Sequence, residues 1–147
     1  MSGHLLIVDD ERDIRDMLRR HFALAGHAID CAADGCTALE HLAVSRYEIV
    51  ISDILMPNMD GIQLLARIRQ DYPMVQVIMI TGQISLLNAL ACLRHGALTC
   101  IFKPLSDLGQ LDQAVDLGLQ RLQDWQRIFS CLRGLEDTPT RIGVADG

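Results

Sequence analysis

Five short apolar runs recur along the chain, and segments with helical periodicity separate them. The runs are LLIV, AIDCA, EIVIS, VQVIMI and LTCIF, at residues 5–8, 28–32, 48–52, 75–80 and 98–102. Most of them lack the alternation of polar and apolar residues that marks a strand with one solvated face, and AIDCA is the weakest of the five. Continuous apolar runs of this length are typical of parallel strands that are buried on both faces. The sequence therefore predicts five parallel strands.

Each run is followed by a segment whose apolar residues recur at spacings of three and four, as on one face of a helix. These segments cover about residues 14–24, 38–43, 62–68, 84–95 and 108–133. A regular alternation of strands and helices predicts an α/β fold with helices on both faces of the sheet. We expect a (βα)₅ doubly wound, flavodoxin-like parallel sheet with strand order 2-1-3-4-5 and an extended C-terminal helix.

The composition limits the classes of protein that are compatible with this fold. The 147 residues suit one domain, which we place at residues 1–121, followed by a C-terminal helical extension and a loose tail at 122–147. A net charge of −6 argues against direct DNA binding and against anionic membranes. The N-terminus resembles no signal peptide, and no apolar run approaches about 18 residues, so we expect a soluble, cytoplasmic protein. We interpret five scattered cysteines as reduced packing residues: Cys31, Cys36, Cys92, Cys100 and Cys131.

Polar residues stand at the ends of four of the predicted strands. Asp9 and Asp10 follow the first strand, Asp53 the third, Thr81 the fourth, and Lys103, the single lysine of the chain, the fifth. In doubly wound sheets the carboxyl ends of the strands lie along one edge, where ligands bind. We therefore expect these five side chains to form one site.

The residue types at these positions predict a particular chemistry. Three neighbouring carboxylates with no His or Cys favour Mg²⁺ or Mn²⁺. A lysine charge and a threonine hydroxyl beside such an ion suit a phosphoryl group. A carboxylate can accept that group as an acyl phosphate. We assign the acceptor role to Asp53, which ends the central strand, and the metal-ligand role to Asp9 and Asp10.

Four motifs together resemble the receiver domain of bacterial two-component response regulators. They are VDDE at 8–11, SDILMPNMDG at 52–61, ITG at 80–82 and FKP at 102–104, and the resemblance extends over about residues 4–120. It implies a phosphorylation-dependent signalling switch whose output passes through protein contacts. It also implies that a sensor histidine kinase or a histidine phosphotransfer protein donates a phosphoryl group to Asp53.

The resemblance further implies a role for each site residue. Asp10, Asp53 and the backbone carbonyl of Leu55 would hold Mg²⁺, with Asp9 acting through water. Thr81 would move toward the acyl phosphate. Lys103 would bind a phosphoryl oxygen, and its bond to Pro104 would be cis. Such a domain is not an enzyme acting on a separate substrate, but a phosphoacceptor that assists its own phosphorylation and dephosphorylation.

Three alternatives compete with this interpretation. One is a Mg²⁺-dependent phosphohydrolase with an aspartate nucleophile, although such enzymes generally carry a second aspartate where this chain has Leu55. Another is a receiver-like scaffold that is not phosphorylated. For any single aspartate the simplest alternative is helix capping, and Asp9 or Asp10 could cap a helix that begins at Glu11. The chain also departs from the family at Cys100, where an aromatic residue is usual, so the sequence does not show how a signal leaves the site.

The last predicted helix is longer than a receiver domain requires. Its apolar residues step by threes and fours along a seam interrupted by one glycine: Leu108, Leu111, Val115, Gly118, Leu122, Trp125, Phe129 and Leu132. We expect the helix to stop at Gly134. Its second half either folds back over its own domain or meets another protein, and we favour a homodimer through this helix. The sequence does not identify the downstream effector.

Overall fold

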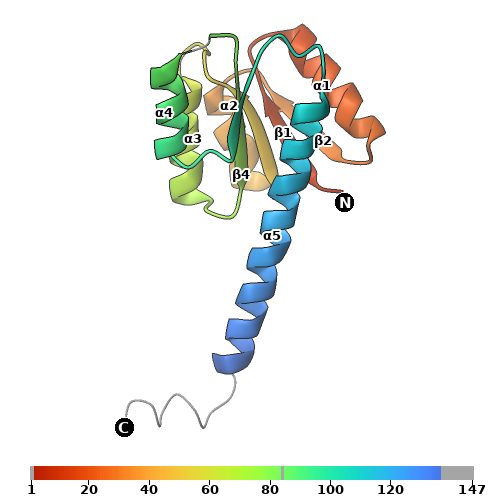
Figure 1. The fold of residues 1–147 in the computed structure, drawn as a ribbon, viewed down its shortest axis with the longest axis vertical. Helices are drawn as coiled ribbons and strands as arrows, with labels where there is room; N and C mark the ends of the chain where they lie inside the picture. The colour runs from red at the N-terminus through yellow and green to blue at the C-terminus, as the bar shows by residue number, and fades with distance from the viewer. Residues whose placement is uncertain (1, 84, 137–147) are drawn as a thin grey trace.

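The fold is described from a computed structural model, in which residues 2–83 and 85–136 are described. All five predicted strands are present, each within one residue of its predicted ends. They are β1 His4–Val8, β2 Ala28–Ala32, β3 Ile49–Asp53, β4 Gln76–Thr81 and β5 Thr99–Phe102. They form one parallel sheet in the order β2-β1-β3-β4-β5, so the predicted topology is confirmed (Figure 1).

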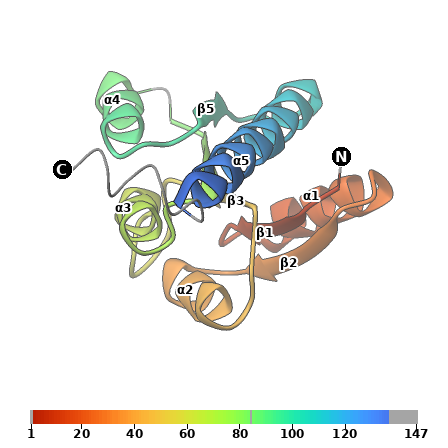
Figure 2. The same ribbon diagram turned by 90° about the horizontal axis from the view of Figure 1, so that it is seen from below.

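Five helices cover the two faces of this sheet. They are α1 Arg12–Leu24, α2 Gly35–Val44, α3 Gly61–Asp71, α4 Leu86–Arg94 and α5 Gly109–Glu136. Helices α1 and α5 lie on one face, and α2, α3 and α4 lie on the other (Figure 2). Along β1, Leu5 and Ile7 pack under the first pair of helices, whereas Leu6 and Val8 pack under the other three. Both faces are therefore buried, which explains why the strands contain continuous apolar runs.

The start of α3 is fixed against the end of β3. Asp60 caps the helix by accepting the backbone N–H of Gln63, whose side chain accepts the Asp60 N–H in return. Gly61 donates its N–H to the carbonyl of Ile54 at 2.7 Å. A Cβ at Gly61 would lie 2.1 Å from the carbonyl oxygen of Asp53, so this close approach requires glycine. The loop that carries Asp53 is thereby held by backbone contacts.

The first half of α5 packs on the sheet, and Gly118 explains the interruption in its apolar seam. A Cβ at Gly118 would lie 2.6 Å from Cδ1 of Ile49 and 3.1 Å from Cδ2 of Leu98. The glycine therefore allows the helix to approach the sheet more closely than a larger residue would. Leu122 is the last buried apolar residue of the helix, at 5 % exposure.

Beyond Leu122, α5 continues as one helix past the end of the sheet and does not fold back over the domain (Figure 1). The prediction that it stops at Gly134 is wrong, because the helix reaches Glu136. A glycine inside a helix costs only about 1 kcal/mol relative to alanine, and this is not enough to end a helix. The predicted tail at 137–147 lies outside the described residues.

Among the helices of residues 2–83 and 85–136, none has both the length and the apolar character that crossing a membrane demands.

Candidate functional site

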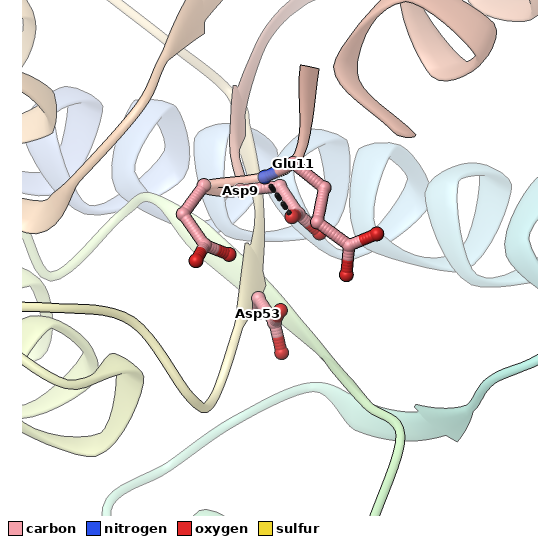
Figure 3. A group of neighbouring side chains, drawn as sticks. Asp9, Glu11 and Asp53 are labelled. Atoms are coloured by element: carbon pink, nitrogen blue, oxygen red, sulfur yellow. Dashed lines mark hydrogen bonds between the residues drawn. The ribbon is translucent and has the colours of Figure 1, made fainter. Parts of the chain in front are cut away.

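The order of the strands brings Asp9 and Asp53 together. β1 lies beside β3, with Val8 paired to Ser52, so the next residue on each strand stands at the same edge of the sheet. Both aspartates are buried, at 1 % and 5 % exposure. Figure 3 shows their carboxylates with that of Glu11, whose backbone N–H donates to Oδ1 of Asp9 at 2.9 Å. The site therefore begins as a pocket of buried negative charge.

Four carboxylates converge in this pocket. Asp9, Asp10, Glu11 and Asp53 each offer one oxygen, and these four oxygens lie within 4.8 Å of one another. A donor set made only of oxygens fits Mg²⁺ or Mn²⁺ rather than zinc. The prediction from sequence included the three aspartates but missed Glu11. Its adjacency to the Asp9-Asp10 pair was the available signal, but a glutamate before a helix is also an ordinary helix-start residue.

Lys103 provides the positive charge of the site. Its Nζ lies 3.1 Å from Oδ2 of Asp53, 3.2 Å from Oδ2 of Asp9 and 3.6 Å from Oε1 of Glu11. The side chain starts at the end of β5 and passes the end of β4 to reach β3. Gly82 follows β4 there, and a Cβ at this glycine would only touch the lysine stem, at 3.9 Å from Cδ. The single lysine thus joins the two buried aspartates, as its place at a strand end predicted.

The pKa values in the pocket follow from burial and from these charges. Burial raises the pKa of Asp9, and the neighbouring charge of Asp53 adds to this effect. The hydrogen bond from Glu11 and the charge of Lys103 offset it only in part. Burial alone would lower the pKa of Lys103, but its hydrogen bonds and ion pairs with Asp53 and Asp9 raise it instead. The lysine is therefore firmly charged, whereas Asp9 holds a proton more readily than a free aspartate does.

Thr81 and Leu55 lie beside the carboxylate pocket in different ways. Thr81 is fully buried at the end of β4, and its hydroxyl exchanges hydrogen bonds with the backbone of Gln83, accepting the N–H at 3.1 Å and donating to the carbonyl at 3.3 Å. Leu55 is 48 % exposed, and its N–H donates to Oδ1 of Asp53 at 3.3 Å. The Lys103–Pro104 peptide is cis, as the resemblance implied.

The capping alternative accounts for only part of this geometry. The N-cap residue of α1 is Glu11, and no side chain caps the helix there. Asp9 does accept the N–H of Glu11, but its other oxygen is bound to Lys103. Asp10 is exposed, and among the described residues its carboxylate has no hydrogen bond or ion pair. Helix capping therefore explains neither the ion pair of Asp9 nor the position of Asp10.

The position where the family usually carries an aromatic residue is occupied by a pair of cysteines. Cys100 on β5 packs against the same core cluster as the buried Cys92 of α4. Burial raises the pKa of both thiols, that of Cys92 to about 12. The prediction of packing thiols therefore holds for Cys92 and Cys100, whereas Cys36 and Cys131 are exposed and do not pack in the core.

Comparison with known proteins identifies the family. The sequence model of the family described as "Response regulator receiver domain" matches residues 5–116. The regulatory protein AtoC of Escherichia coli K12 is 40 % identical over 118 residues, which are 80 % of this chain and 25 % of AtoC. The DNA-binding transcriptional regulator NtrC of the same organism is 36 % identical over 126 residues, or 84 % of this chain and 26 % of NtrC. The chain thus spans about a quarter of the length of these relatives.

A solved structure agrees with the sequence matches. The signal receiver domain of an HD domain-containing protein from Pseudomonas fluorescens Pf-5 superposes with a TM-score of 0.80 at 30 % identity, covering 84 % of this chain and 99 % of that one. The resemblance drawn from the four motifs is therefore confirmed, together with the fold. The chain belongs to the response regulator receiver domain family.

Proposed function

We propose that this phosphorylation-dependent signalling switch accepts its phosphoryl group on Asp53. The observation that carries the proposal is the position of this carboxylate, buried at the end of the central strand with Oδ2 at 3.1 Å from Lys103 Nζ. A carboxylate oxygen of Asp53 attacks phosphorus, and the P–N bond of a phosphohistidine breaks, with its electron pair returning to the imidazole. The product is an acyl phosphate on Asp53. The donor is a sensor histidine kinase or a histidine phosphotransfer protein.

A divalent cation fits the pocket because its donors are all oxygens. We assign Asp10, Asp53 and the carbonyl of Leu55 as ligands of Mg²⁺ or Mn²⁺, with Asp9 acting through water. When bound, the cation offsets the negative charge that gathers on the phosphoryl oxygens. One solved relative supports this assignment: the response regulator TrrA of Thermotoga maritima, in complex with Mg²⁺-BeF, is 28 % identical. It superposes with a TM-score of 0.71, covering 78 % of this chain and 97 % of that one.

Lys103 and Thr81 respond to the new charge on Asp53. In the unphosphorylated protein Lys103 is shared between Asp53 and Asp9. After transfer, its ammonium binds a phosphoryl oxygen, because that oxygen carries more negative charge than the phosphorylated carboxyl group does. The Thr81 hydroxyl donates to Gln83 over a long 3.3 Å, and it exchanges this weak bond for a stronger one to the phosphoryl group. The loop before α4 thereby loses a contact when Asp53 is phosphorylated.

Acetyl phosphate separates this function from its rivals. With Mg²⁺, intact-mass measurement should show one added phosphoryl group in the unchanged protein and none in Asp53→Asn. Asp71→Asn is the matched control, because Asp71 is an exposed aspartate on α3 that pairs with Arg67. Steady release of phosphate from phosphate esters would instead support a phosphohydrolase. Absence of any added mass in the unchanged protein would support a scaffold that is not phosphorylated.

We also propose that output passes through protein contacts rather than through DNA bound by this chain. NtrC is named as DNA-binding, but the chain spans only 26 % of its length. Here the net charge of −6 disfavours contact with phosphate backbones. A cytoplasmic location agrees with a histidine kinase as donor. The chain acts as a phosphoacceptor and not as an enzyme that turns over a separate substrate.

The projecting part of α5 is the surface that we propose for a homodimer. Five large apolar side chains on it are each 43–49 % exposed: Trp125, Ile128, Phe129, Leu132 and Leu135. Together they present roughly 400–500 Å² of surface per copy, and two copies would bury about 1,000 Å², near the lower limit of a specific interface. The charged pair on this segment, Asp124 and Arg127, is satisfied within the helix at 2.8 Å.

Analytical ultracentrifugation tests the homodimer on the full chain. Leu132→Asp should shift the protein toward monomer, because it would bring two carboxylates into an apolar interface. Leu24→Asp is the control, since Leu24 is an exposed leucine on α1. A monomeric unchanged protein at concentrations of about 100 μM would exclude the homodimer at the affinity expected of such an interface.

A further inference from the structure

The loop that joins β1 to α1 carries two of the proposed metal ligands, and the structure holds these two very differently. The backbone N–H of Asp9 donates to the carbonyl of Ala32 at 3.2 Å, and both oxygens of its carboxylate are engaged, by the Glu11 N–H and by Lys103. Asp10 is exposed, and among the described residues its side chain has no partner. The direction of the Asp10 side chain is therefore set by the backbone that carries it.

One side chain from α1 holds the peptide between Asp9 and Asp10. Nη1 of Arg15 donates to the carbonyl oxygen of Asp9 at 2.8 Å. This carbonyl belongs to the planar peptide that also contains the nitrogen and the Cα of Asp10, so holding the oxygen fixes the plane from which the Asp10 side chain leaves. On the other side of Asp10, the Glu11 N–H is held by Oδ1 of Asp9, and the side chain of Glu11 itself makes no cap bond to α1.

We propose that Arg15 is a positioning residue, which holds the Asp9–Asp10 peptide so that the Asp10 carboxylate stays directed at the divalent cation. The inference rests on the proposed role of Asp10 as a metal ligand. Among the described residues, Arg15 makes no hydrogen bond or ion pair with any of the four carboxylates of the site. It acts through one backbone carbonyl, as residues outside the ligand set commonly do at metal sites.

An electrostatic role and a positioning role of Arg15 predict opposite changes in Mg²⁺ affinity when its side chain is replaced. A guanidinium near a cation site repels the cation, so loss of its charge alone would tighten Mg²⁺ binding. Loss of the hydrogen bond frees the peptide, and binding then weakens, because the Asp10 carboxylate must be ordered each time a cation binds. The sign of the change in Mg²⁺ affinity therefore distinguishes a positioning role from a purely electrostatic one.

The experiment is titration calorimetry of the full chain with MgCl₂, for Arg15→Met and for the control Arg12→Met. Arg12 lies on the same helix and is 84 % exposed, and among residues 2–83 and 85–136 its one ion pair is with Asp16, so its replacement removes the same charge without breaking the bond to the Asp9 carbonyl. Arg15→Met should raise the Mg²⁺ dissociation constant about tenfold, and Arg12→Met should leave it unchanged or lower it. Arg15→Lys, which keeps a donor, should recover part of the affinity. Equal affinities in the two methionine variants would overturn the proposal.

Two further measurements keep the outcomes separate. Asp10→Asn is titrated in parallel: if it binds Mg²⁺ as well as the unchanged protein does, the proposed ligand role of Asp10 is wrong. If Asp10→Asn binds weakly and Arg15→Met binds normally, only the role of Arg15 is wrong. Urea unfolding in EDTA checks that each variant is folded. Should Arg15→Met unfold, Arg15→Gln takes its place, because it also removes the charge and its shorter side chain loses the bond to the Asp9 carbonyl; full Mg²⁺ affinity in that variant would overturn the proposal.

Discussion

Replacing Lys103 by methionine tests the charge balance of the site. Methionine is close to lysine in length but removes the cation that lies 3.1 and 3.2 Å from two buried carboxylates. Removing one partner of a buried ion pair typically costs about 3–5 kcal/mol, because the remaining charge is left without compensation. The lysine side chain is 15 % exposed, so we take the lower end, about 3 kcal/mol, for the protein without metal. At low pH the loss should shrink, because Asp9 can then bind a proton.

Magnesium should reverse most of this loss. Mg²⁺ neutralises the same carboxylates, and removal of the lysine charge strengthens its binding, so the ion should stabilise Lys103→Met more than it stabilises the unchanged protein. A ligand at a hundredfold excess over its dissociation constant adds about 2.7 kcal/mol to the free energy of unfolding. The difference between the two proteins should therefore narrow as Mg²⁺ is added.

Urea unfolding followed by far-UV circular dichroism, in EDTA and in Mg²⁺, measures these free energies. Arg127→Met is the control, because Arg127 pairs with Asp124 at 2.8 Å but is 72 % exposed. This variant should lose less than about 1 kcal/mol, with or without Mg²⁺. A loss in Lys103→Met that is as small as in the control, or that Mg²⁺ leaves unchanged, would refute the reasoning.

Three further predictions concern the pocket and the core. Because burial raises the pKa of Asp9, the folded protein binds a proton on this carboxylate more tightly than the unfolded chain does, so in EDTA the free energy of unfolding should fall as pH rises above about 4. Asp9→Asn should lack this fall. If the free energies of the two proteins followed the same pH dependence, the raised pKa of Asp9 would be contradicted. Gly61→Ala places a Cβ 2.1 Å from the Asp53 carbonyl oxygen, so it should lower the free energy of unfolding by about 1–3 kcal/mol. It should also reduce phosphorylation by acetyl phosphate. A variant with unchanged stability and phosphorylation would show that the close approach does not require glycine. Iodoacetamide at pH 8 should alkylate exposed Cys36 at least about tenfold faster than buried Cys92, whose pKa is raised to about 12. Peptide mass mapping measures both rates. Equal rates would mean that the reagent reaches Cys92 in the folded protein.

The sequence predicts the strands well, and also which polar residues meet at the edge of the sheet, for a physical reason. A strand buried on both faces needs an apolar residue at every position, so the polar residue that ends each run is conspicuous. Val8-Asp9 and Ser52-Asp53 show this, because the two pairs lie side by side on neighbouring strands. The proximity of these aspartates follows from the strand order of the doubly wound sheet, which places β1 beside β3.

Other residues depend on contacts that a single sequence does not specify. The role of Arg15 depends on the path of the β1–α1 loop, which returns the Asp9 carbonyl to the first turns of the helix. Gly118 interrupts an apolar seam in the sequence, but in the fold it marks the close approach of α5 to Ile49. Gly134 has the same residue type and a similar sequence context, yet a Cβ there would meet nothing within 4 Å. Whether a glycine in the helix permits a close approach depends on the packing around it, and the spacing of apolar residues in the sequence does not show that packing.

Cys100 limits how a change at the site can reach α4. Cys100 on β5 and Cys92 on α4 are small and their thiols are protonated, so no large ring at this position can change rotamer and move the helix. A rearrangement of α4 must then begin in its own backbone, at the loop that precedes Leu86. The described residues connect that loop to the site through the two hydrogen bonds between Thr81 and Gln83. If Thr81 turns toward a phosphoryl group on Asp53, the bond that it donates to the Gln83 carbonyl breaks, and the loop before α4 loses this contact.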